Sequence, residues 1–340
     1  MKALVSRKLL ERRILLPLFL ILAQAAFATD RVDIQMLTNN ALRITVNGKL
    51  FTDYHFTNEL QTPAPARPYF CPVLGPGDSP MTRQWPMEPG EGEEHDHPHH
   101  RGLWYGHASV DGIDFWTDKN TNNSFVSVSG ARVVHTKFLE IKSGDQSGVI
   151  RSTDNWVTKD GEIVCTDERA LTVYARPDSE RLFDFDITLH APANKPVVLG
   201  DEKDGTIAVR VAESMRLTRK DKSHGDGHIV QSTGARDAET WGKRADWCDY
   251  SGPVNGKTVG IAIFDNPKNP RHPTWWHVRD YGLFAANPVG VHFFENKPPH
   301  AGDLTIAPGE SITFRYRFYM HEGDDQQAKV ADHYKEYCQP

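Results

Sequence analysis

The residues best suited to chemistry lie in one stretch, residues 94–107, which holds five of the 16 histidines together with an arginine and two aromatic residues. Imidazole is the commonest metal ligand in proteins and titrates near neutral pH. Pro98 excludes a helix interior, so we expect extended geometry at His97, with His95, His97 and His99 on one face. Five titratable rings at this spacing indicate a functional site rather than a plain surface loop.

Three further stretches, residues 200–205, 241–250 and 269–277, carry more aromatic and charged residues than a turn requires. Loops gathered at one side of a β-sandwich commonly hold the functional site, so we expect them to meet the histidine stretch. Trp and Tyr rings suit the apolar faces of sugar rings, whereas Asp, Glu, Arg and His bind hydroxyl groups. For Trp104 and the pair Trp275-Trp276 two interpretations stay open, the wall of a site or the core of the fold.

Strand patterns must position these residues. Residues 181–190 and 312–318 alternate apolar and polar side chains, which is typical of half-buried strands in an antiparallel sheet. Asn47-Gly48, between residues 32–46 and 49–54, predicts a hairpin. Regular strands separated by turns predict an all-β fold. We expect further strands at residues 69–74, 125–141, 147–158, 162–175, 206–211, 258–264 and 291–294, and a helix only at about residues 325–337.

The first 28 residues have the pattern of a signal peptide, with basic residues, an apolar run and the cleavage site Ala26-Phe27-Ala28. We therefore expect one β-sandwich domain at residues 29–340, located in the periplasm or outside the cell, with no membrane span. The formal net charge is −6 and no basic patch is present, which argues against a nucleic-acid partner. The four cysteines allow three disulfide pairings.

The run His97-Pro98-His99-His100-Arg101-Gly102-Leu103-Trp104-Tyr105-Gly106-His107, followed by residues 111–116, resembles the hallmark of an exported bacterial family known as "methane oxygenase PmoA"-like. Residues 199–205, 241–252 and 266–277 are similar to other motifs of that family. The resemblance covers nearly the whole chain after the leader. It implies an exported protein of polysaccharide-degrading bacteria and assigns no catalytic residue.

Near the end of the chain, residues 304–310 and 314–318 are similar to the closing strands of galactose mutarotase-like proteins. This second resemblance implies a large antiparallel β-supersandwich, here with a short C-terminal helix. The fold hosts epimerases, polysaccharide lyases and glycoside hydrolases, so it narrows the architecture and leaves the reaction open.

The first hypothesis is a carbohydrate-active epimerase, lyase or hydrolase that uses acid–base chemistry. A histidine would supply the acid and a carboxylate the base, while Arg101 would neutralise a carboxylate or a developing oxyanion through its planar fork. The candidate catalytic residues are His99, His100, Arg101, His107 and Glu202, with Asp201 or Glu295 as alternative bases. The candidate substrate contacts are Trp104, Asp201, Arg244, Trp275, His277 and Glu295.

Two other functions fit the same residues. A metal-dependent oxidase or hydrolase would bind a divalent ion of copper, zinc or iron through His97, His99 and His107, with Glu94 or Asp96. A non-catalytic module would present aromatic rings to a glycan. In each case the expected partner is a carbohydrate or another small molecule.

The mature protein is predicted to begin at Thr29, because the small-residue cleavage site ends at Ala28. Intact mass spectrometry of the protein recovered from its native exporting host checks this. A mature chain that still carries Met1 would contradict both the leader and the exported location.

Overall fold

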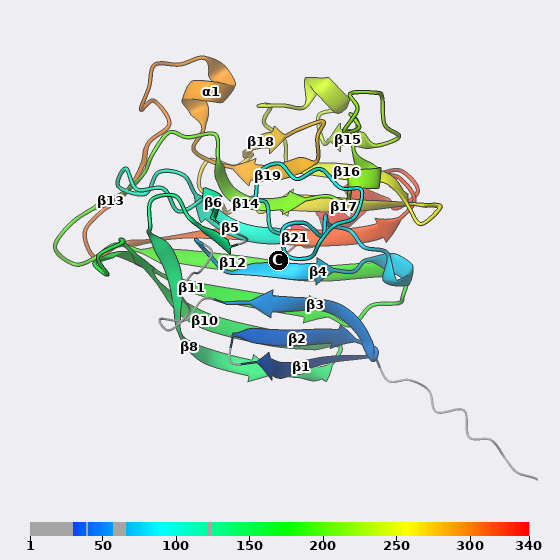
Figure 1. The fold of residues 1–340 in the computed structure, drawn as a ribbon, viewed down its shortest axis with the longest axis horizontal. Coiled ribbons are helices and arrows are strands. Elements are labelled where there is room, and N and C mark those ends of the chain that lie inside the picture. The colour runs from blue at the N-terminus through cyan, green and yellow to red at the C-terminus, as the bar shows by residue number, and fades with distance from the viewer. Residues whose placement is uncertain (1–29, 39, 57–65, 122–123, 340) are drawn as a thin grey trace, which may run out of the picture.

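The computed structural model of the chain describes residues 30–38, 40–56, 66–121 and 124–339, and the predicted leader lies outside them. A nine-stranded sheet and an eight-stranded sheet form two layers, with the nine-stranded sheet in front in Figure 1. Neighbouring strands of both large sheets pair antiparallel, as in β10–β11 and β14–β5. The predicted all-β fold of large antiparallel sheets, with a short C-terminal helix, is confirmed.

The nine-stranded sheet has the spatial order β18-β19-β14-β5-β4-β3-β2-β1-β9. Its strands are β1 (Arg31–Thr38), β2 (Ala41–Val46), β3 (Lys49–His55), β4 (Tyr69–Val73), β5 (Leu103–His107), β9 (Gly144–Asp145), β14 (Gly205–Arg210), β18 (Trp275–Val278) and β19 (Leu283–Asn287).

The eight-stranded sheet has the order β15-β16-β17-β21-β12-β11-β10-β8. Its strands are β8 (Arg132–Lys142), β10 (Ser147–Val157), β11 (Ile163–Tyr174), β12 (Glu180–His190), β15 (His228–Gln231), β16 (Trp247–Val254), β17 (Lys257–Asp265) and β21 (Ser311–Glu322). Two small sheets pair β6 (Asp118–Thr121) with β7 (Ser124–Ser127) and β13 (Val197–Leu199) with β20 (Leu304–Ile306). The helices are α1 (Val291–Glu295) and α2 (Val330–Tyr337), with short 3-10 turns at Pro76–Asp78, Glu213–Met215 and Asp237–Glu239.

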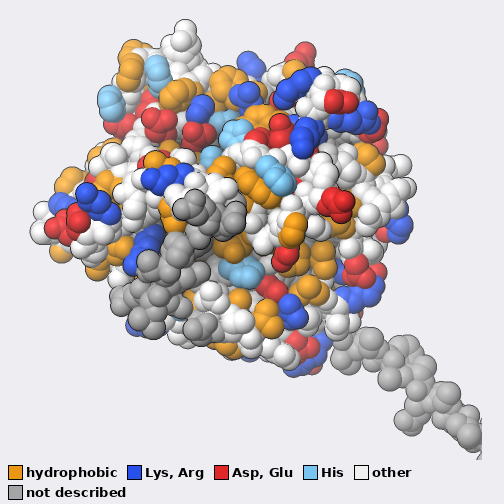
Figure 2. Space-filling view, viewed as in Figure 1, with side chains coloured by type: hydrophobic (Ala, Val, Ile, Leu, Met, Phe, Trp, Pro, Cys, Tyr) orange, Lys and Arg blue, Asp and Glu red, His pale blue; other side chains and the backbone are white. Residues whose placement is uncertain are grey.

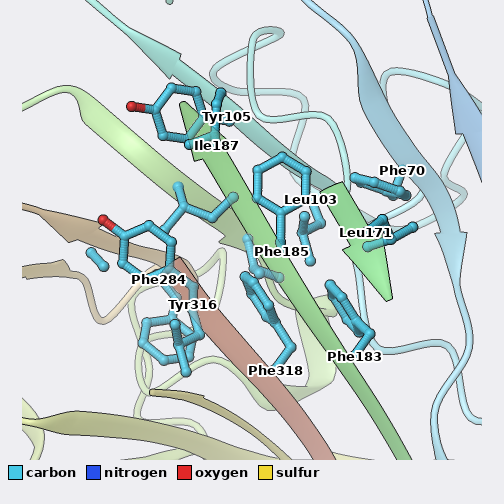
Figure 3. Packing of buried hydrophobic residues seen from close by; sticks show 14 of the residues in the cluster. Phe70, Leu103, Tyr105, Leu171, Phe183, Phe185, Ile187, Phe284, Tyr316 and Phe318 are labelled. Atoms are coloured by element: carbon cyan, nitrogen blue, oxygen red, sulfur yellow. The ribbon is translucent and has the colours of Figure 1, made fainter. Parts of the chain in front are cut away.

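The hydrophobic core fills the space between the two large sheets (Figure 3). Phe183 of β12 lies parallel to Phe318 of β21, with 4.6 Å between ring centroids. The same ring contacts Phe51 of β3, in the other sheet, at 5.6 Å. The alternation read from residues 181–190 is therefore correct, since Phe185 and Ile187 also belong to this core.

The predicted hairpin turn is confirmed. Asn47 and Gly48 have φ values of 54° and 79°, and they connect β2 to β3. Two consecutive positive φ values are what a two-residue type I′ turn requires, which explains the Asn-Gly pair. Residues 32–46, predicted as one strand run, are divided into β1 and β2, which pair with each other.

The strand predicted at residues 291–294 is wrong, because this segment is helix α1. The carboxylate of Asp201 accepts the backbone N–H of His292 at 2.9 Å and so stabilises the first turn. Asn296, with φ of 53°, ends the helix in the left-handed conformation. Aromatic and β-branched composition favoured a strand, and a tertiary contact from a distant loop decided otherwise.

Two stretches predicted as loops also contain strands. β16 begins at Trp247, within residues 241–250, and β18 begins at Trp275, within residues 269–277. The tail helix is present but starts later than predicted, at Val330, and Tyr334 packs its ring against Phe264 of β17.

The described helices include none long and apolar enough to cross a membrane. All four cysteines lie within the described residues and are free thiols there, with Cys338 exposed and the others buried.

Replacing Phe183 by alanine is predicted to lower the free energy of unfolding by about 3–5 kcal/mol, because it leaves a cavity between the sheets. Urea denaturation followed by fluorescence measures this. Ile141→Ala, at a position 40% exposed on β8, is the control and should change stability little. Equal effects of the two variants would contradict this account of the core.

Candidate functional site

The candidate site lies on the outer face of the nine-stranded sheet, at the end formed by β18, β19, β14 and β5. Leu103, Tyr105 and Val209 point into the core. Because strand side chains alternate, Trp104 and Arg210 point outward. Figure 2 shows histidine side chains with acidic and basic ones around them in the upper half of this face.

Buried arginines hold the histidine stretch against this face. Arg83, fully buried, donates hydrogen bonds to the backbone carbonyl oxygens of Glu94, Asp96 and His97, at 3.0–3.1 Å. Arg67, also buried, donates to the carbonyl oxygen of His99. A buried guanidinium must have its donors satisfied, so these two side chains determine where the loop backbone lies.

Asp96 binds two buried arginines through one carboxylate oxygen. Its Oδ1 pairs with Arg83 and, at 3.0 Å, with Arg210, while Oδ2 binds Nδ1 of His97 at 2.6 Å. Burial alone would raise the pKa of Asp96. The hydrogen bond from His97 and the charges of Arg210 and Arg83 outweigh burial and hold the pKa well below its usual value.

The expected extended geometry at His97 is wrong. Its φ is 44°, and the N–H of His100 donates to the His97 carbonyl oxygen at 3.0 Å, which makes a tight turn. The turn stacks His97 on His100, with 4.8 Å between centroids and 3° between planes. Gly102, with φ of 55°, completes the bend, because a Cβ there would collide with the carbonyl oxygen of Phe70.

His99 and His100 are neutral rings. Burial, with the charges of neighbouring arginines and histidines, lowers the pKa of each far below its usual value. Nη1 of Arg210 donates to Nδ1 of His100 at 3.1 Å. Since an arginine can only donate, this nitrogen of His100 is the acceptor.

A line of rings continues from the histidine turn across the sheet. His97 stacks on Tyr281 at 5.3 Å and 4°. The guanidinium carbon of Arg279 lies 5.5 Å from the ring centre of Tyr281 and 5.8 Å from that of Trp241. Trp241 in turn meets His277 edge to face at 6.3 Å.

His277 of β18 has one ring nitrogen fixed. Its Nδ1 lies 2.7 Å from the carbonyl oxygen of Lys203, and because a carbonyl only accepts, Nδ1 carries the proton. Burial lowers the pKa of His277 to about 4, although the Lys203 carbonyl and the nearby carboxylate of Asp204, at 3.9 Å, raise it. The ring is thus neutral near neutral pH, and Nε2 is its proton acceptor.

Two predicted catalytic residues lie away from this line. Arg101 binds the carboxylate of Asp118 at 3.1 Å and covers the ring of Tyr69. His107, on the strand face opposite to Trp104, is buried and donates from Nε2 to the Gly200 carbonyl oxygen at 2.7 Å. Gly205 packs directly on its Nδ1. Both ring nitrogens of His107 therefore face the protein interior, where they are not placed to give a proton to a substrate on the outer face.

Three of the predicted substrate contacts form their own group at the edge of the sheet. Nε1 of Trp275 donates to Glu295 at 3.0 Å, and Arg244 covers the Trp275 ring at 4.4 Å. Asp201 is buried and binds backbone N–H groups, so its role is structural. Glu202 is partly exposed beside Asp204, and burial followed by that negative charge raises its pKa.

Of the two interpretations left open for the tryptophans, the wall of a site applies to Trp104 and the core of the fold to Trp276. Trp104 lies on the outer face and stacks on His100 at 5.3 Å. Trp276 points into the core. The metal triad is not assembled: within the described residues no three His, Cys, Asp or Glu side chains are placed to hold a metal ion. His107 faces the interior, away from His97 and His99.

A groove of about 670 Å³ lies beside the histidine stretch, lined by Trp85, Pro86, Met87, Glu88, Pro89, His95 and Asn120. The rings of Trp85 and His95 stack at 4.9 Å and 8°. This volume is in the range of small-molecule sites, and a stacked pair gives it an aromatic wall.

Sequence analysis missed Asp204, Arg210, Arg279 and Tyr281. Arg210 ends a strand that contains no other charged residue, and a buried arginine needs partners, so that position could have been recognised. Arg279 and Tyr281 lie in the turn after the 269–277 stretch. Their relation to the histidines depends on long-range pairing of β14 with β19, which no local pattern contains.

The profile of a family of unknown function, DUF6807, matches residues 41–335. The chain belongs to this family. No curated protein matches the chain. The family carries no described activity, so the site must be interpreted from its own geometry.

Among solved structures the chain is similar to a glycoside hydrolase family 97 enzyme from Pseudoalteromonas sp. strain K8, with 11% identity, 86% of this chain and 34% of that chain covered, and a TM-score of 0.32. It is similar to a polysaccharide lyase at 12% identity, with 87% and 33% covered and a TM-score of 0.34. It is also similar to a GalM/aldose epimerase homologue from C. elegans at 8% identity, with 86% and 100% covered and a TM-score of 0.29. The chain spans about a third of the length of the first two, and similarities at this level say nothing of activity.

Asp96→Asn is predicted to lower the free energy of unfolding by about 2–3 kcal/mol near pH 7, because two buried arginines lose their shared carboxylate. The value lies below that of a fully buried pair, since the Asp96 side chain is 24% exposed. The folded-state pKa is depressed, so the stabilisation is complete above the unfolded pKa of about 3.9 and is lost as the pH falls below it.

Denaturation of wild type and Asp96→Asn between pH 7 and pH 3 should therefore show a gap that is constant at higher pH and narrows below about pH 4. Asp332→Asn, in an exposed pair with Lys335, is the control and should leave stability nearly unchanged. A gap that widens as the pH falls would contradict the proposed role of Asp96.

Proposed function

We propose that this protein is an exported carbohydrate-active enzyme that acts on a sugar or glycoside by acid–base chemistry on the outer face of the nine-stranded sheet. The observation that carries the proposal is the state of His277. Its Nδ1–H is bound to Lys203, and among the described residues Nε2 has no hydrogen-bond partner. A neutral imidazole with a free acceptor nitrogen can take a proton from a substrate.

A second group must return a proton. Burial raises the pKa of Tyr281, so its phenol stays protonated near neutral pH and can donate. His97, exposed and hydrogen-bonded to Asp96, stacks on Tyr281 and lies on the same face. Epimerisation, elimination and glycoside hydrolysis each need an acid and a base at one sugar ring, so the substrate selects among them.

The walls of the site suit a sugar. Trp241 and Tyr281 offer ring faces, and the groove at Trp85 and His95 offers room for further sugar units. The same rings favour a second candidate, a glycan-binding module without catalysis.

We include in the proposal an exported location and the resemblance to the PmoA-like family. A metal-dependent reaction is not part of it, because the described residues contain no group of three His, Cys, Asp or Glu side chains that could hold a metal ion.

The test is a screen of soluble polysaccharides, oligosaccharides and aryl glycosides for new reducing ends, unsaturated products or interconverted anomers. On any substrate found, His277→Gln should lower kcat/KM by at least about 100-fold, the contribution of a general base. Its amide can still donate to the Lys203 carbonyl, so the melting temperature should change little. His190→Asn, exposed at the end of β12 in the other sheet, is the matched control and should keep full activity.

Two results would contradict the proposal. Glycan binding without any product would leave the binding module as the function. Product formed by His277→Gln at the wild-type rate would show that the base lies elsewhere.

A further inference from the structure

Arg279 differs from the other cations of the outer face. Within the described residues its guanidinium forms neither a hydrogen bond nor an ion pair. Arg67, deeper in the fold, is bound by backbone carbonyl oxygens. Arg244, at the edge of the sheet, donates to the backbone carbonyl oxygens of Pro273 and Arg271. Five more cations pair with carboxylates: Arg83 and Arg210 with Asp96, Arg216 with Glu94 and Glu213, Lys203 with Asp204, and Arg101 with Asp118.

The position of Arg279 is nevertheless fixed. Its backbone N–H donates to the carbonyl oxygen of Leu283 at 2.7 Å. Its carbonyl oxygen accepts the hydroxyl of Tyr250 at 3.2 Å and the N–H of Gly282 at 3.0 Å. The residue thus sits in the tight turn between β18 and β19, two residues after His277.

Its side chain is held by rings rather than by charges. The guanidinium lies 5.5 Å from the centre of Tyr281 and 5.8 Å from that of Trp241, and the residue is half-buried. Cation–π contacts engage the flat faces of a guanidinium and leave its edge donors available. The five N–H groups point outward in the plane of the fork, where a planar pair of oxygens can be bound.

The charges of the site favour a negative ligand. Within the described residues Arg279 has no carboxylate partner, and His277 beside it is neutral, so the charge of its guanidinium is available to a negative ligand. From this geometry we infer that Arg279 binds a carboxylate of the substrate, and that the substrate class is a uronic acid or an oligosaccharide that contains one.

This inference rests on the proposed function for its position beside the base. His277 and Arg279 both lie on the segment that ends β18, and Trp241 contacts both side chains. A uronate held by its carboxylate at Arg279 therefore presents its ring to Trp241, Tyr281 and Nε2 of His277. Arg279 binds and orients, and His277 handles the proton.

The test compares oligosaccharides that differ only in the carboxylate. Tetrasaccharides from polygalacturonate, alginate and glucuronan are each matched with their carboxyl-reduced forms, and binding is measured by calorimetry at low and at high salt. For at least one scaffold, wild type should bind the acidic form at least about tenfold more tightly, the free-energy scale of a charge-assisted hydrogen bond. High salt should reduce this ratio, because part of the attraction is screened.

Three variants assign the preference. Arg279→Gln should bring the ratio to within about twofold of one, and Arg279→Lys, which keeps the charge but not the fork, should retain only part of it. Arg151→Gln, on β10 of the other sheet where Arg151 pairs with Glu168, should keep the full wild-type ratio. Circular dichroism and thermal melting confirm that each variant is folded.

The outcomes separate the two claims. A carboxylate preference that depends on Arg279 supports the inference even if no product is ever formed, in which case only the proposed activity fails. Equal binding of acidic and reduced forms on all scaffolds, or a preference that survives in Arg279→Gln, overturns the inference even if neutral sugars are turned over. Stronger binding of a sulfated neutral tetrasaccharide than of every uronate would also overturn it, because the ligand would then be a sulfate ester.

Discussion

The outer face of this protein depends on buried guanidinium groups that must satisfy their donors. Arg83 donates hydrogen bonds to three backbone carbonyl oxygens between Glu94 and His97, and Arg67 donates to that of His99. Neither side chain can be left unpaired away from water. These hydrogen bonds fix the position of the loop backbone against the sheet. The position of the loop in turn sets where the histidine turn packs and where His97 meets Tyr281.

The same arrangement changes what the histidines can do. Burial and the charges of neighbouring arginines and histidines lower the pKa of His99 and of His100, so both rings are neutral near pH 7 and act through hydrogen bonds and ring stacking. The expectation that one of them is the acid does not agree with these surroundings. The proposed chemistry moves to His277, whose Nδ1 is fixed and whose Nε2 is free, while Asp96 binds Arg210 and His97 in the histidine turn.

The architecture could be predicted from sequence because its signals are local. Alternation in β12 and β21, the Asn47-Gly48 turn and the tail helix each depend on a few neighbouring residues. Composition alone predicted a functional site at the histidine stretch, and its role in a site stays a prediction. The conformation of the stretch was not predicted, because Pro98 suggests extended geometry at His97, whereas contacts with Arg83 and Tyr281 favour a turn.

The parts of the site that escaped prediction depend on strand order. His277 shares a sheet face with Trp104, on which the histidine turn packs, only because β18, β19, β14 and β5 are neighbours in one sheet, although residues 103–107 and 275–278 are far apart in sequence. His107 and Trp104 share a strand but face opposite ways, so spacing within the stretch could not distinguish site from core. Helix α1 likewise formed where a strand was expected, because Asp201 binds its first turn from a remote loop.

The most direct test of this account is the protonation state of His277, followed by two-dimensional ¹⁵N–¹H NMR of the imidazole nitrogens, with His277→Gln used to assign the signals. The account predicts a neutral ring with the proton on Nδ1 at pH 7 and a titration midpoint at about 4. A proton on Nε2, or a midpoint near the ordinary value of about 6.5, would contradict it.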